Sequence, residues 1–368
     1  AMAARFTGGL DGSDPDGSDP DGSDPDGSDP DGSDPGASGR IESLWGAVDE
    51  RARFAGQDDW MYRQINGSGV DLVGNLRLGF RCNQDCGFCW QDRAWPEPPP
   101  HLYLQWLDEM AARGLRSLAI TGGEPTLHPA LPTLIQRAEQ VHQISVSLQT
   151  NAVLLAKPSR MKKLVDAGLR SIFVSLHSHV GGISDAITRA PGTHKMTIRG
   201  VQAALEAGLD VHINCVVERR NAHNLGQFAS WLVTTWVTDQ ANPVAAVTFS
   251  EPCRSHDAAQ FEAVALPYDE VRGPLTDALA VLADAGVRTF ALSTCGFAPC
   301  MLTEHPQLLH RQLAAAARPE ATDDTDQAGR TFLPVCETCA VRSRCLGIRR
   351  EYAQLHGSRG LLPVPASV

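Results

Sequence analysis

Segments with strand-like and helix-like patterns alternate along most of this chain of 368 residues. Apolar alternation or short apolar runs predict strands at seven places, namely residues 71–80, 116–121, 143–150, 171–178, 210–217, 245–250 and 287–293. Helical periodicity fills the intervals, for example at residues 101–114 and 132–142. Gly114, Gly168 and Gly208 each lie shortly before a predicted strand, where glycine commonly ends a helix.

Repeated pairs of a strand and a helix form a parallel sheet, because the helix carries the chain back to the start of the next strand. The pattern therefore predicts an α/β fold, a full or partial (β/α) barrel of about six βα units. In such folds the chemistry lies at the carboxyl ends of the strands. We expect the barrel at residues 71–290 and a small cysteine-rich extension at residues 291–368.

The N-terminal part has a different composition. Residues 11–35 read DGSDP five times and contain no apolar side chain, so burial cannot offset the entropy lost on ordering. We therefore expect a disordered tail at residues 1–36. A calcium site is the alternative, although the run lacks the glutamate that closes a helix-loop-helix calcium loop. Residues 37–70 are expected to be a polar lead-in with a short helix near residues 41–54.

Charge limits the classes of partner. The formal net charge is −11, and the repeat contributes ten aspartates, so the rest of the chain is nearly neutral. This balance argues against a basic stripe for nucleic acid and against a polybasic membrane anchor. Apolar runs stay below the roughly 18 residues of a membrane span, and no signal-like segment opens the chain. We expect a cytoplasmic protein with a small or peptide-sized partner.

Most of the cysteines form two groups, which in a reducing compartment indicate metal binding or catalysis rather than disulfides. The first group is Cys82, Cys86 and Cys89, directly after the first predicted strand. Three thiolates suit an iron-sulfur cube with one open iron, whereas a structural zinc usually takes four ligands. The turn TGGEP, residues 121–125, follows the second strand and should face the cysteines. By contrast, Cys215 lies in an apolar strand and is expected to be a buried hydrophobic residue.

A Cys-x3-Cys-x2-Cys loop with an aromatic residue, Phe88, before its last cysteine, followed about thirty residues later by GGEP, resembles the radical S-adenosylmethionine (SAM) superfamily. The resemblance implies that the cluster cleaves SAM to methionine and a 5'-deoxyadenosyl radical, which removes a hydrogen from a substrate. It implies that Gly122, Gly123, Glu124 and Pro125 form the turn that holds the methionine part, with Glu124 near its ammonium group.

Other positions match the family's ligand contacts more loosely. The resemblance implies SAM contacts for residues at or near strand ends, namely Thr150, Asn151, Ser175, His177 and Asn214. It also places Arg189 where a cation could meet the methionine carboxylate. The alternatives are a core or rim histidine for His177 and a solvated surface arginine for Arg189. The glycine-rich pattern of the family's fifth strand is missing from residues 210–217, which leaves the adenine contacts open.

The second cysteine group resembles the shortened SPASM, or twitch, extension of radical SAM enzymes, which holds an auxiliary iron-sulfur cluster. Its pattern is Cys336-x2-Cys339-x5-Cys345, with Cys295 and Cys300 upstream. A full SPASM pattern would place a further cysteine where this chain has Arg349, so one auxiliary cluster is implied. Cys300 with the last three cysteines is the preferred set, and Cys295 is the alternative fourth ligand. A zinc site is the rival interpretation.

The resemblance favours an enzyme that abstracts hydrogen from a small metabolite, with net oxidation or ring formation through the auxiliary cluster. The stretch before Asp71 is short for a peptide-recognition domain of about 80 residues, which favours the small molecule. The alternative is a maturase of a ribosomally made peptide. A non-catalytic electron carrier or zinc protein is the alternative of another class. A flavodoxin or ferredoxin is the expected electron donor.

Overall fold

All seven predicted strand segments contain a strand in the computed structural model, which describes residues 62–66, 72–91, 93–253, 258–292, 295–316 and 329–366. The disordered tail predicted for residues 1–36 and the helix predicted near residues 41–54 lie outside the described residues. The described residues belong to one compact unit that begins at Phe54.

Seven parallel strands form the main sheet in chain order. They are β2 (Val73–Arg77), β3 (Ser117–Thr121), β4 (Ser145–Thr150), β5 (Ser171–Ser175), β6 (Asp210–Val216), β7 (Ala246–Ser250) and β8 (Arg288–Phe290). An eighth strand, β1 (Arg63–Asn66), pairs antiparallel with β2. The strand β1 was not predicted, because its residues RQIN lack apolar alternation. The described sheet runs from β1 to β8 without closing, so the predicted barrel is partial.

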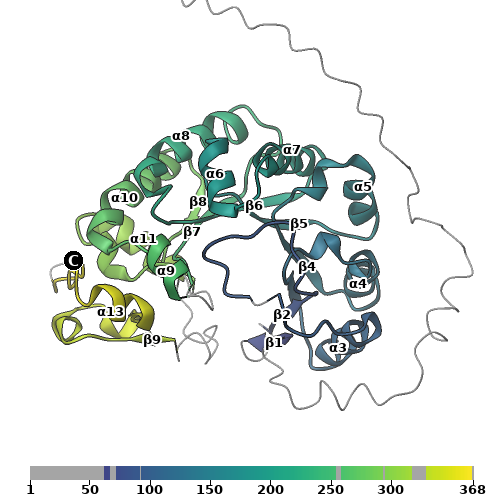
Figure 1. Cartoon of the computed structure of the whole chain (residues 1–368), viewed down its shortest axis with the longest axis horizontal. Coiled ribbons are helices and arrows are strands. Elements are labelled where there is room, and N and C mark those ends of the chain that lie inside the picture. The colour runs from purple at the N-terminus through teal and green to yellow at the C-terminus, as the bar shows by residue number, and fades with distance from the viewer. Residues whose placement is uncertain are drawn as a thin grey trace, which may run out of the picture. The chain divides into compact units, whose positions relative to one another are not determined.

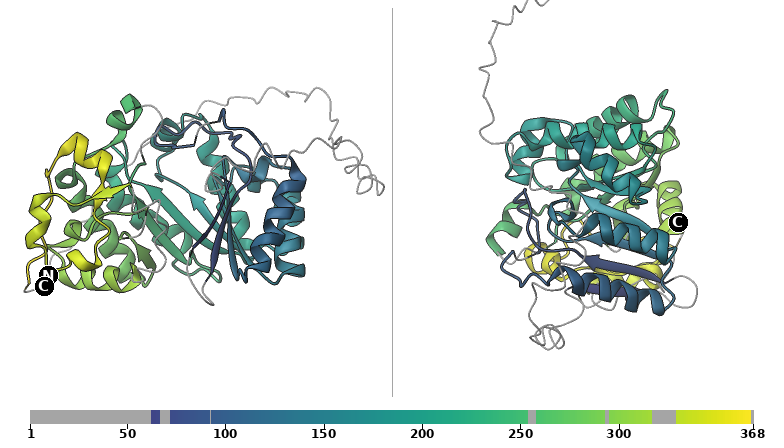
Figure 2. Two further views of the ribbon diagram at one scale, coloured as in Figure 1. Left: turned by 90° about the horizontal axis from the view of Figure 1, so that it is seen from below. Right: turned by 90° about the vertical axis from the view of Figure 1, so that its right-hand side faces the viewer.

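Helices connect the strands, and most of them cover the outer, convex side of the curved sheet (Figures 1 and 2). They are α3 (Pro100–Ala112), α4 (Leu131–Gln136), α5 (Pro158–Asp166), α6 (Gly181–Thr188), α7 (Thr193–Glu206), α8 (Leu225–Trp236), α9 (Ala258–Val264) and α10 (Tyr268–Asp284). The predicted helix at residues 132–142 continues from α4 as a π-helical turn, η3 (Arg137–Val141). Gly114, Gly168 and Gly208 have positive φ at helix ends, as predicted.

Burial alternates along the strands and separates the two faces of the sheet. In β6, Val211, Ile213 and Cys215 are fully buried, whereas His212 and Asn214 are only partly buried. The expectation that Cys215 is a buried hydrophobic residue is therefore confirmed. The fully buried set packs under the helices and forms the apolar core. The other set faces the concave side, where the loop after β2 crosses the sheet (Figure 1). None of the described helices is both long and apolar enough to cross a membrane.

The chain after β8 forms small elements. These are η6 (Pro299–Leu302), α11 (Pro306–Ala316), η8 (Pro334–Thr338), η9 (Arg342–Arg344), α13 (Arg350–His356) and a two-stranded sheet of β9 (Arg330–Thr331) and β10 (Ile348–Arg349). This C-terminal extension contacts the barrel through buried aromatic side chains. The ring centroids of Tyr268 on α10 and Tyr352 on α13 lie 4.0 Å apart, and the Tyr352 hydroxyl accepts a hydrogen bond from the Tyr268 N–H at 2.8 Å.

Candidate functional site

The first cysteine group lies in the loop that leaves the carboxyl end of β2. Cys82, Cys86 and Cys89 are partly exposed free thiols. Burial raises the pKa of Cys82 to about 11, and it also raises the pKa values of Cys86 and Cys89. Cys82 accepts a hydrogen bond from the Gln84 N–H at 3.4 Å. Thiols with raised pKa values become thiolates when metal cations replace their protons, so these residues fit an iron-sulfur cluster.

The GGEP turn is packed directly against the start of this cysteine loop. The Gly123 N–H donates to the Gly79 carbonyl at 3.0 Å, and the Glu124 N–H donates to the Arg81 carbonyl at 2.8 Å. A Cβ on Gly123 would overlap the Arg81 carbonyl, and Gly122 has a φ of +136°. Both positions therefore require glycine, because two backbone segments approach each other more closely than any side chain allows. The predicted meeting of the two motifs is present in the structure.

Glu124 joins the ends of β3 and β4. Its Oε1 accepts hydrogen bonds from the Thr126 N–H at 3.0 Å and from the Thr150 hydroxyl at 2.7 Å, and its Oε2 accepts from the Asn151 N–H at 2.7 Å. The side chain is 2% exposed, and burial raises its pKa. The structure thus places Glu124 as a buried connector of chain segments. Pro125 begins the short helix η2 (Pro125–Leu127) and fixes the turn.

Asn151 links Glu124 to the cysteine loop. Its side-chain Nδ2 donates to the Asn83 side-chain Oδ1 at 2.6 Å, and its backbone carbonyl accepts from the Thr197 hydroxyl of α7 at 2.8 Å. The next residue, Ala152, has a φ of +59°, which is strained for a residue with a Cβ. Thr150 and Asn151 are thus connected through Glu124 and Asn83 to the GGEP turn and the cysteine loop, and the SAM contacts expected of them stay a prediction.

The far side of the cysteine loop rests on α6 and the start of α7. The Asp85 N–H donates to the Thr188 carbonyl at 2.8 Å, and the buried Gln84 side chain donates to the Thr193 hydroxyl at 3.2 Å. Arg189 ends α6 with a φ of +51° and lies 3.9 Å from the Asp85 carboxylate. The guanidinium of Arg189 is thus beside the loop, at a partly exposed position.

His177 lies behind the cysteine loop, shortly after β5. Its ring meets the Phe88 ring edge-on with centroids 5.0 Å apart. Its Nδ1 accepts a hydrogen bond from the Val216 N–H at 3.2 Å, so the neutral ring carries its proton on Nε2. Burial lowers its pKa to about 4. The side chain is therefore a neutral part of the packing under Phe88 at neutral pH.

Ser175 and Asn214 lie side by side at the carboxyl ends of β5 and β6. The Asn214 Oδ1 accepts a hydrogen bond from the Ser250 hydroxyl at the end of β7 at 2.7 Å. The pairing register brings these three polar residues to one edge of the sheet, the edge from which the cysteine loop leaves. This row of hydroxyl and amide groups extends the site away from the cysteines.

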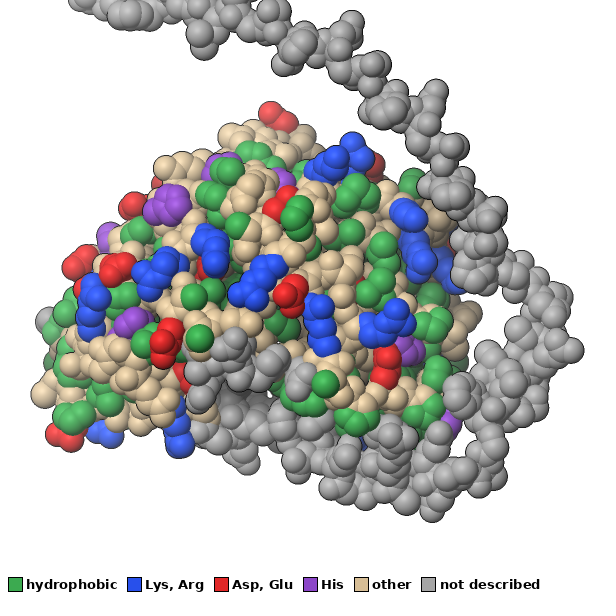
Figure 3. Space-filling view, viewed as in Figure 1, with side chains coloured by type: hydrophobic (Ala, Val, Ile, Leu, Met, Phe, Trp, Pro, Cys, Tyr) green, Lys and Arg blue, Asp and Glu red, His purple; other side chains and the backbone are tan. Residues whose placement is uncertain are grey.

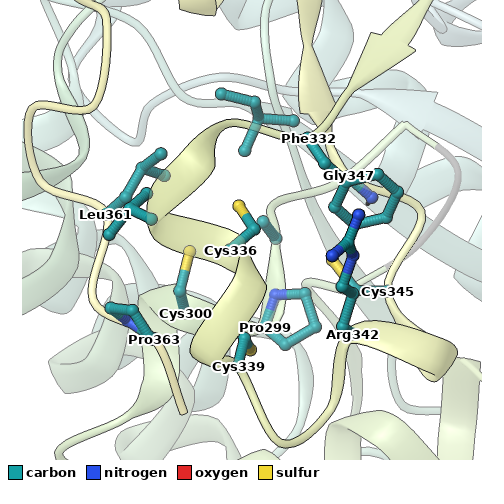
Figure 4. Close-up of a pocket in the computed structure, with 13 residues that line it drawn as sticks. Pro299, Cys300, Phe332, Cys336, Cys339, Arg342, Cys345, Gly347, Leu361 and Pro363 are labelled. Carbon is teal, nitrogen blue, oxygen red and sulfur yellow. Dashed lines mark hydrogen bonds between the residues drawn. The ribbon is translucent and has the colours of Figure 1, made fainter.

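The second cysteine group surrounds a separate pocket in the C-terminal extension. Cys300, Cys336, Cys339 and Cys345 all line it, and Figure 4 shows them around one space with Phe332 and Leu361. The space between these residues that is free of atoms amounts to about 380 Å³, open solvent at its mouth included. Cys295 is exposed and does not line it. Between the two sequence alternatives, the structure places Cys300 with the other three.

Thiols of the second group raise the pKa values of their neighbours Cys300 and Cys345. Burial raises the pKa of Cys300 to about 12 and that of Cys345 to about 11, and neighbouring thiols of the group add to both shifts. Cys345 accepts a hydrogen bond from the Gly347 N–H at 3.2 Å. In the described part of the chain, no three His, Cys, Asp or Glu side chains surround one point as the ligands of a single metal ion do. In a four-iron cluster each thiolate binds its own iron.

Sequence reasoning missed several polar residues that shape these sites. Asn83 and Gln84 lie inside the first cysteine motif, and their spacing gives no sign of their partners on β4 and α7. Arg272 is a charged residue on the buried face of α10, among the apolar residues Val271, Leu275 and Leu279. A charge within an apolar helical stripe is a signal that the sequence does contain.

Comparisons with known proteins agree with this geometry. Residues 76–232 match the family model of the radical SAM superfamily. The PqqA peptide cyclase of Bradyrhizobium diazoefficiens is 29% identical over 161 residues, which cover 43% of this chain and 42% of that protein. The probable GTP 3',8-cyclase of Aeropyrum pernix is 36% identical over 158 residues, which cover 40% of this chain and 42% of that protein. This chain thus spans less than half the length of these curated relatives.

Among solved structures, Streptococcus suis SuiB bound to the precursor peptide SuiA is similar with a TM-score of 0.49 and 16% identity, over 64% of this chain and 51% of that chain. The match to the family model begins within β2 and ends within α8, so it contains the cysteine loop, the GGEP turn and the carboxyl ends of β2 to β6. Residues 76–232 of this chain form a domain of the radical SAM superfamily.

Proposed function

We propose that this chain is a radical SAM enzyme that closes a ring within a peptide substrate. The observation that carries the proposal is the packing of the GGEP turn on the loop of Cys82, Cys86 and Cys89 at the carboxyl ends of β2 and β3. An electron carrier would not require such a turn, because it does not bind an amino acid beside its cluster. The alternative of a non-catalytic carrier is therefore less well supported.

The cofactors of radical SAM domains are a four-iron, four-sulfur cluster and SAM. We propose Cys82, Cys86 and Cys89 as the ligands of the catalytic cluster. When bound and reduced, this cluster supplies the electron that splits SAM into methionine and a 5'-deoxyadenosyl radical. A flavodoxin or ferredoxin is the proposed source of that electron.

The residues around the cysteines have separate tasks in this proposal. Gly122 and Gly123 bring the end of β3 against the loop, which leaves backbone carbonyls free to receive the methionine ammonium group. Glu124 orders Thr150 and Asn151, and Asn151 holds the loop through Asn83. Ser175 and Asn214 are proposed to contact the ribose, and Arg189 is proposed to attract the methionine carboxylate.

The two relatives named above are both cyclases by name, which favours ring closure as the reaction class. Forming a carbon–carbon bond from two C–H bonds within a substrate removes two hydrogen atoms. The 5'-deoxyadenosyl radical takes one as a hydrogen atom, and the other leaves as a proton and an electron, so an electron acceptor is needed. We propose that Cys300, Cys336, Cys339 and Cys345 hold an auxiliary cluster, which would supply that acceptor.

The polar side chains at the ends of β5, β6 and β7 bear on the class of substrate. The hydroxyl and amide groups of Ser175, Asn214 and Ser250 are suited to hydrogen bonds with uncharged peptide groups. The PqqA peptide cyclases favour a peptide as well. A nucleotide is the second candidate, on the 36% identity to a probable GTP 3',8-cyclase.

Anaerobic reconstitution tests the cofactor assignment. We expect about eight irons per chain, from two four-iron clusters, and 5'-deoxyadenosine after addition of dithionite and SAM. Replacing Cys82, Cys86 and Cys89 by Ala should remove about four irons and all 5'-deoxyadenosine. The matched control is Cys215→Ala, which changes a buried cysteine that belongs to neither group and should keep both readouts.

Two outcomes would contradict the proposal. Zinc in place of iron would exclude radical chemistry, and 5'-deoxyadenosine formed by the triple variant would place the catalytic cluster elsewhere. To test the substrate, a peptide encoded beside the gene and GTP should be compared by mass spectrometry. Loss of two hydrogen atoms from the peptide is expected, whereas conversion of GTP alone would replace the peptide with the nucleotide.

A further inference from the structure

Two buried arginines lie against the pocket of the second cysteine group. Arg272 on α10 is 8% exposed and Arg330 on β9 is 6% exposed. Figure 3 shows the usual environment of such residues, since Lys and Arg side chains on the face it displays are spread over the surface among uncharged ones. Arginine stays charged in proteins, so burying it requires a compensating anion or several acceptors.

Arg272 reaches the backbone on two sides of the pocket. Its Nη2 donates to the Cys300 carbonyl at 3.3 Å and to the Gly360 carbonyl. Cys300 lines the pocket, and Leu361, which follows Gly360, also lines it. The buried Nε of Arg272 has no hydrogen-bond partner, and among the residues that the structure describes no carboxylate forms an ion pair with it. Within the described part of the chain, the buried positive charge of Arg272 is thus met only by the partial negative charges of carbonyl oxygens.

Arg330, on β9, also contacts backbone beside the pocket. Its Nη1 donates to the Gly347 carbonyl at 2.9 Å, and its Nη2 donates to the Gly296 carbonyl at 3.2 Å. Gly347 lines the pocket, and its N–H donates to the Cys345 sulfur.

We propose that Arg272 and Arg330 are the buried counter-charges of the auxiliary cluster and raise its reduction potential. This inference rests on the proposed function, in which the four cysteines hold that cluster. A four-iron cluster with four thiolate ligands is an anion, and it becomes more negative when it gains an electron. Fixed positive charges in a poorly solvated site therefore stabilise the reduced form more than the oxidised form. The two arginines thus suit the cluster to accept an electron.

The test measures the reduction potential of the auxiliary cluster without the catalytic one. The parent is the full chain with Cys82, Cys86 and Cys89 replaced by Ala. Arg272→Met, Arg272→Lys and Arg330→Met are added to it one at a time, and each protein is titrated with EPR detection. The matched control is Arg170→Met, because Arg170 also donates to backbone carbonyls but is exposed and far along the chain from the cysteines.

For Arg272→Met and for Arg330→Met we expect the equilibrium constant for reduction to fall about tenfold, which is about 59 mV for one electron. Arg272→Lys and Arg170→Met should stay near the parent. A cluster-loaded Arg272→Met with the parent potential would overturn the inference, as would an equal fall in Arg272→Lys, since charge is retained there. If Arg272→Met does not bind iron, an unchanged potential in Arg330→Met overturns it.

The proposed function fails in a different way. A parent without iron would show that the four cysteines hold no cluster, which removes the auxiliary cluster and this inference together. A parent with iron and an insensitive potential leaves the cluster in place and removes only the role of the arginines. Iron content of the parent is therefore measured first.

Discussion

At the scale of single residues, the contact between the two motifs depends on an absent side chain. The carbonyl oxygen of Arg81 occupies the space that a Cβ on Gly123 would need. Gly123 belongs to the GGEP turn and Arg81 precedes Cys82 of the cysteine loop. A methyl group there would push the cysteine loop away from the end of β3. The distance between the loop and the turn is therefore set by glycine, whereas Pro125 only fixes the direction that follows.

Gly123→Ala should reduce iron binding at the first cysteine group. We expect reconstituted protein to lose about four of its eight irons and its 5'-deoxyadenosine production, with the auxiliary iron retained. Gly182→Ala is the matched control, because a Cβ at Gly182 in α6 meets no atom within 4 Å. Full iron content in Gly123→Ala would show that the loop tolerates the displacement.

His177 gives a pH-dependent contribution to stability. Its pKa falls from 6.5 in the unfolded chain to about 4 in the fold, so the unfolded chain binds a proton that the folded chain does not. Stability is therefore complete above pH 6.5 and is lost as the pH falls toward 4. Between pH 7 and pH 5 the loss should be about 2 kcal/mol.

His177→Gln removes this titration and offers an amide oxygen to the Val216 N–H. Urea unfolding at pH 7 and pH 5 should show a difference smaller by about 2 kcal/mol in the variant than in the wild type. An identical pH dependence in both proteins would mean that His177 is accessible to protons in the folded state.

At the scale of elements, α7 secures the loop after β4. A Cβ at Gly200 would overlap the carbonyl oxygen of Ala152, and Thr197 donates to the Asn151 carbonyl. Thr193, at the start of the same helix, accepts from Gln84 in the cysteine loop. One helix thus holds two strand-end loops, and its closeness to the sheet depends on Gly200.

Gly200→Ala and Gly226→Ala should change stability in opposite directions. At Gly200 the added methyl group forces α7 outward, with a cost of about 1–3 kcal/mol and weaker SAM binding. At Gly226 in α8 a Cβ meets only the Asp277 Cβ, at an ordinary contact distance of 3.7 Å, so alanine should stabilise the helix by about 0.5–1 kcal/mol. Chemical denaturation of both variants decides the matter, and a stabilised Gly200→Ala would contradict the packing described for α7.

At the scale of the whole molecule, a buried ion pair joins the barrel to the C-terminal extension. The Arg349 Nε lies 3.2 Å from the Glu251 Oε2, and the two side chains are 13% and 5% exposed. The Tyr268 hydroxyl donates to the other oxygen of Glu251. The predicted resemblance to the SPASM extension would place a cysteine at Arg349. In this chain the position is used for attachment to the end of β7.

Arg349→Met should destabilise the protein by about 3 kcal/mol, because it leaves the Glu251 charge buried without its partner. Adding Glu251→Gln should recover part of this loss, since the amide still accepts from Tyr268 and carries no charge. A double-mutant cycle by urea unfolding measures the coupling. Additive losses would show that the two side chains do not interact across the boundary.

Local and repetitive features of this protein could be predicted from the amino-acid sequence. Seven strand segments, the helix-ending glycines and the cysteine groups follow from periodicity, backbone preference and spacing, which act over a few residues. The parallel order of the strands then follows from the βα alternation, so the meeting of the cysteine loop with the GGEP turn could be predicted as well.

The pairing of distant residues, by contrast, emerged with the folded structure. The choice of Cys300 over Cys295, the bonds from Asn83 to Asn151 and from Glu124 to Thr150, and the burial of Arg272 beside Cys300 depend on how separate elements dock. The strand β1 likewise forms because the edge of β2 offers backbone partners to residues with little strand pattern of their own. Such contacts arise from packing and hydrogen-bond satisfaction across the fold, which no local pattern encodes.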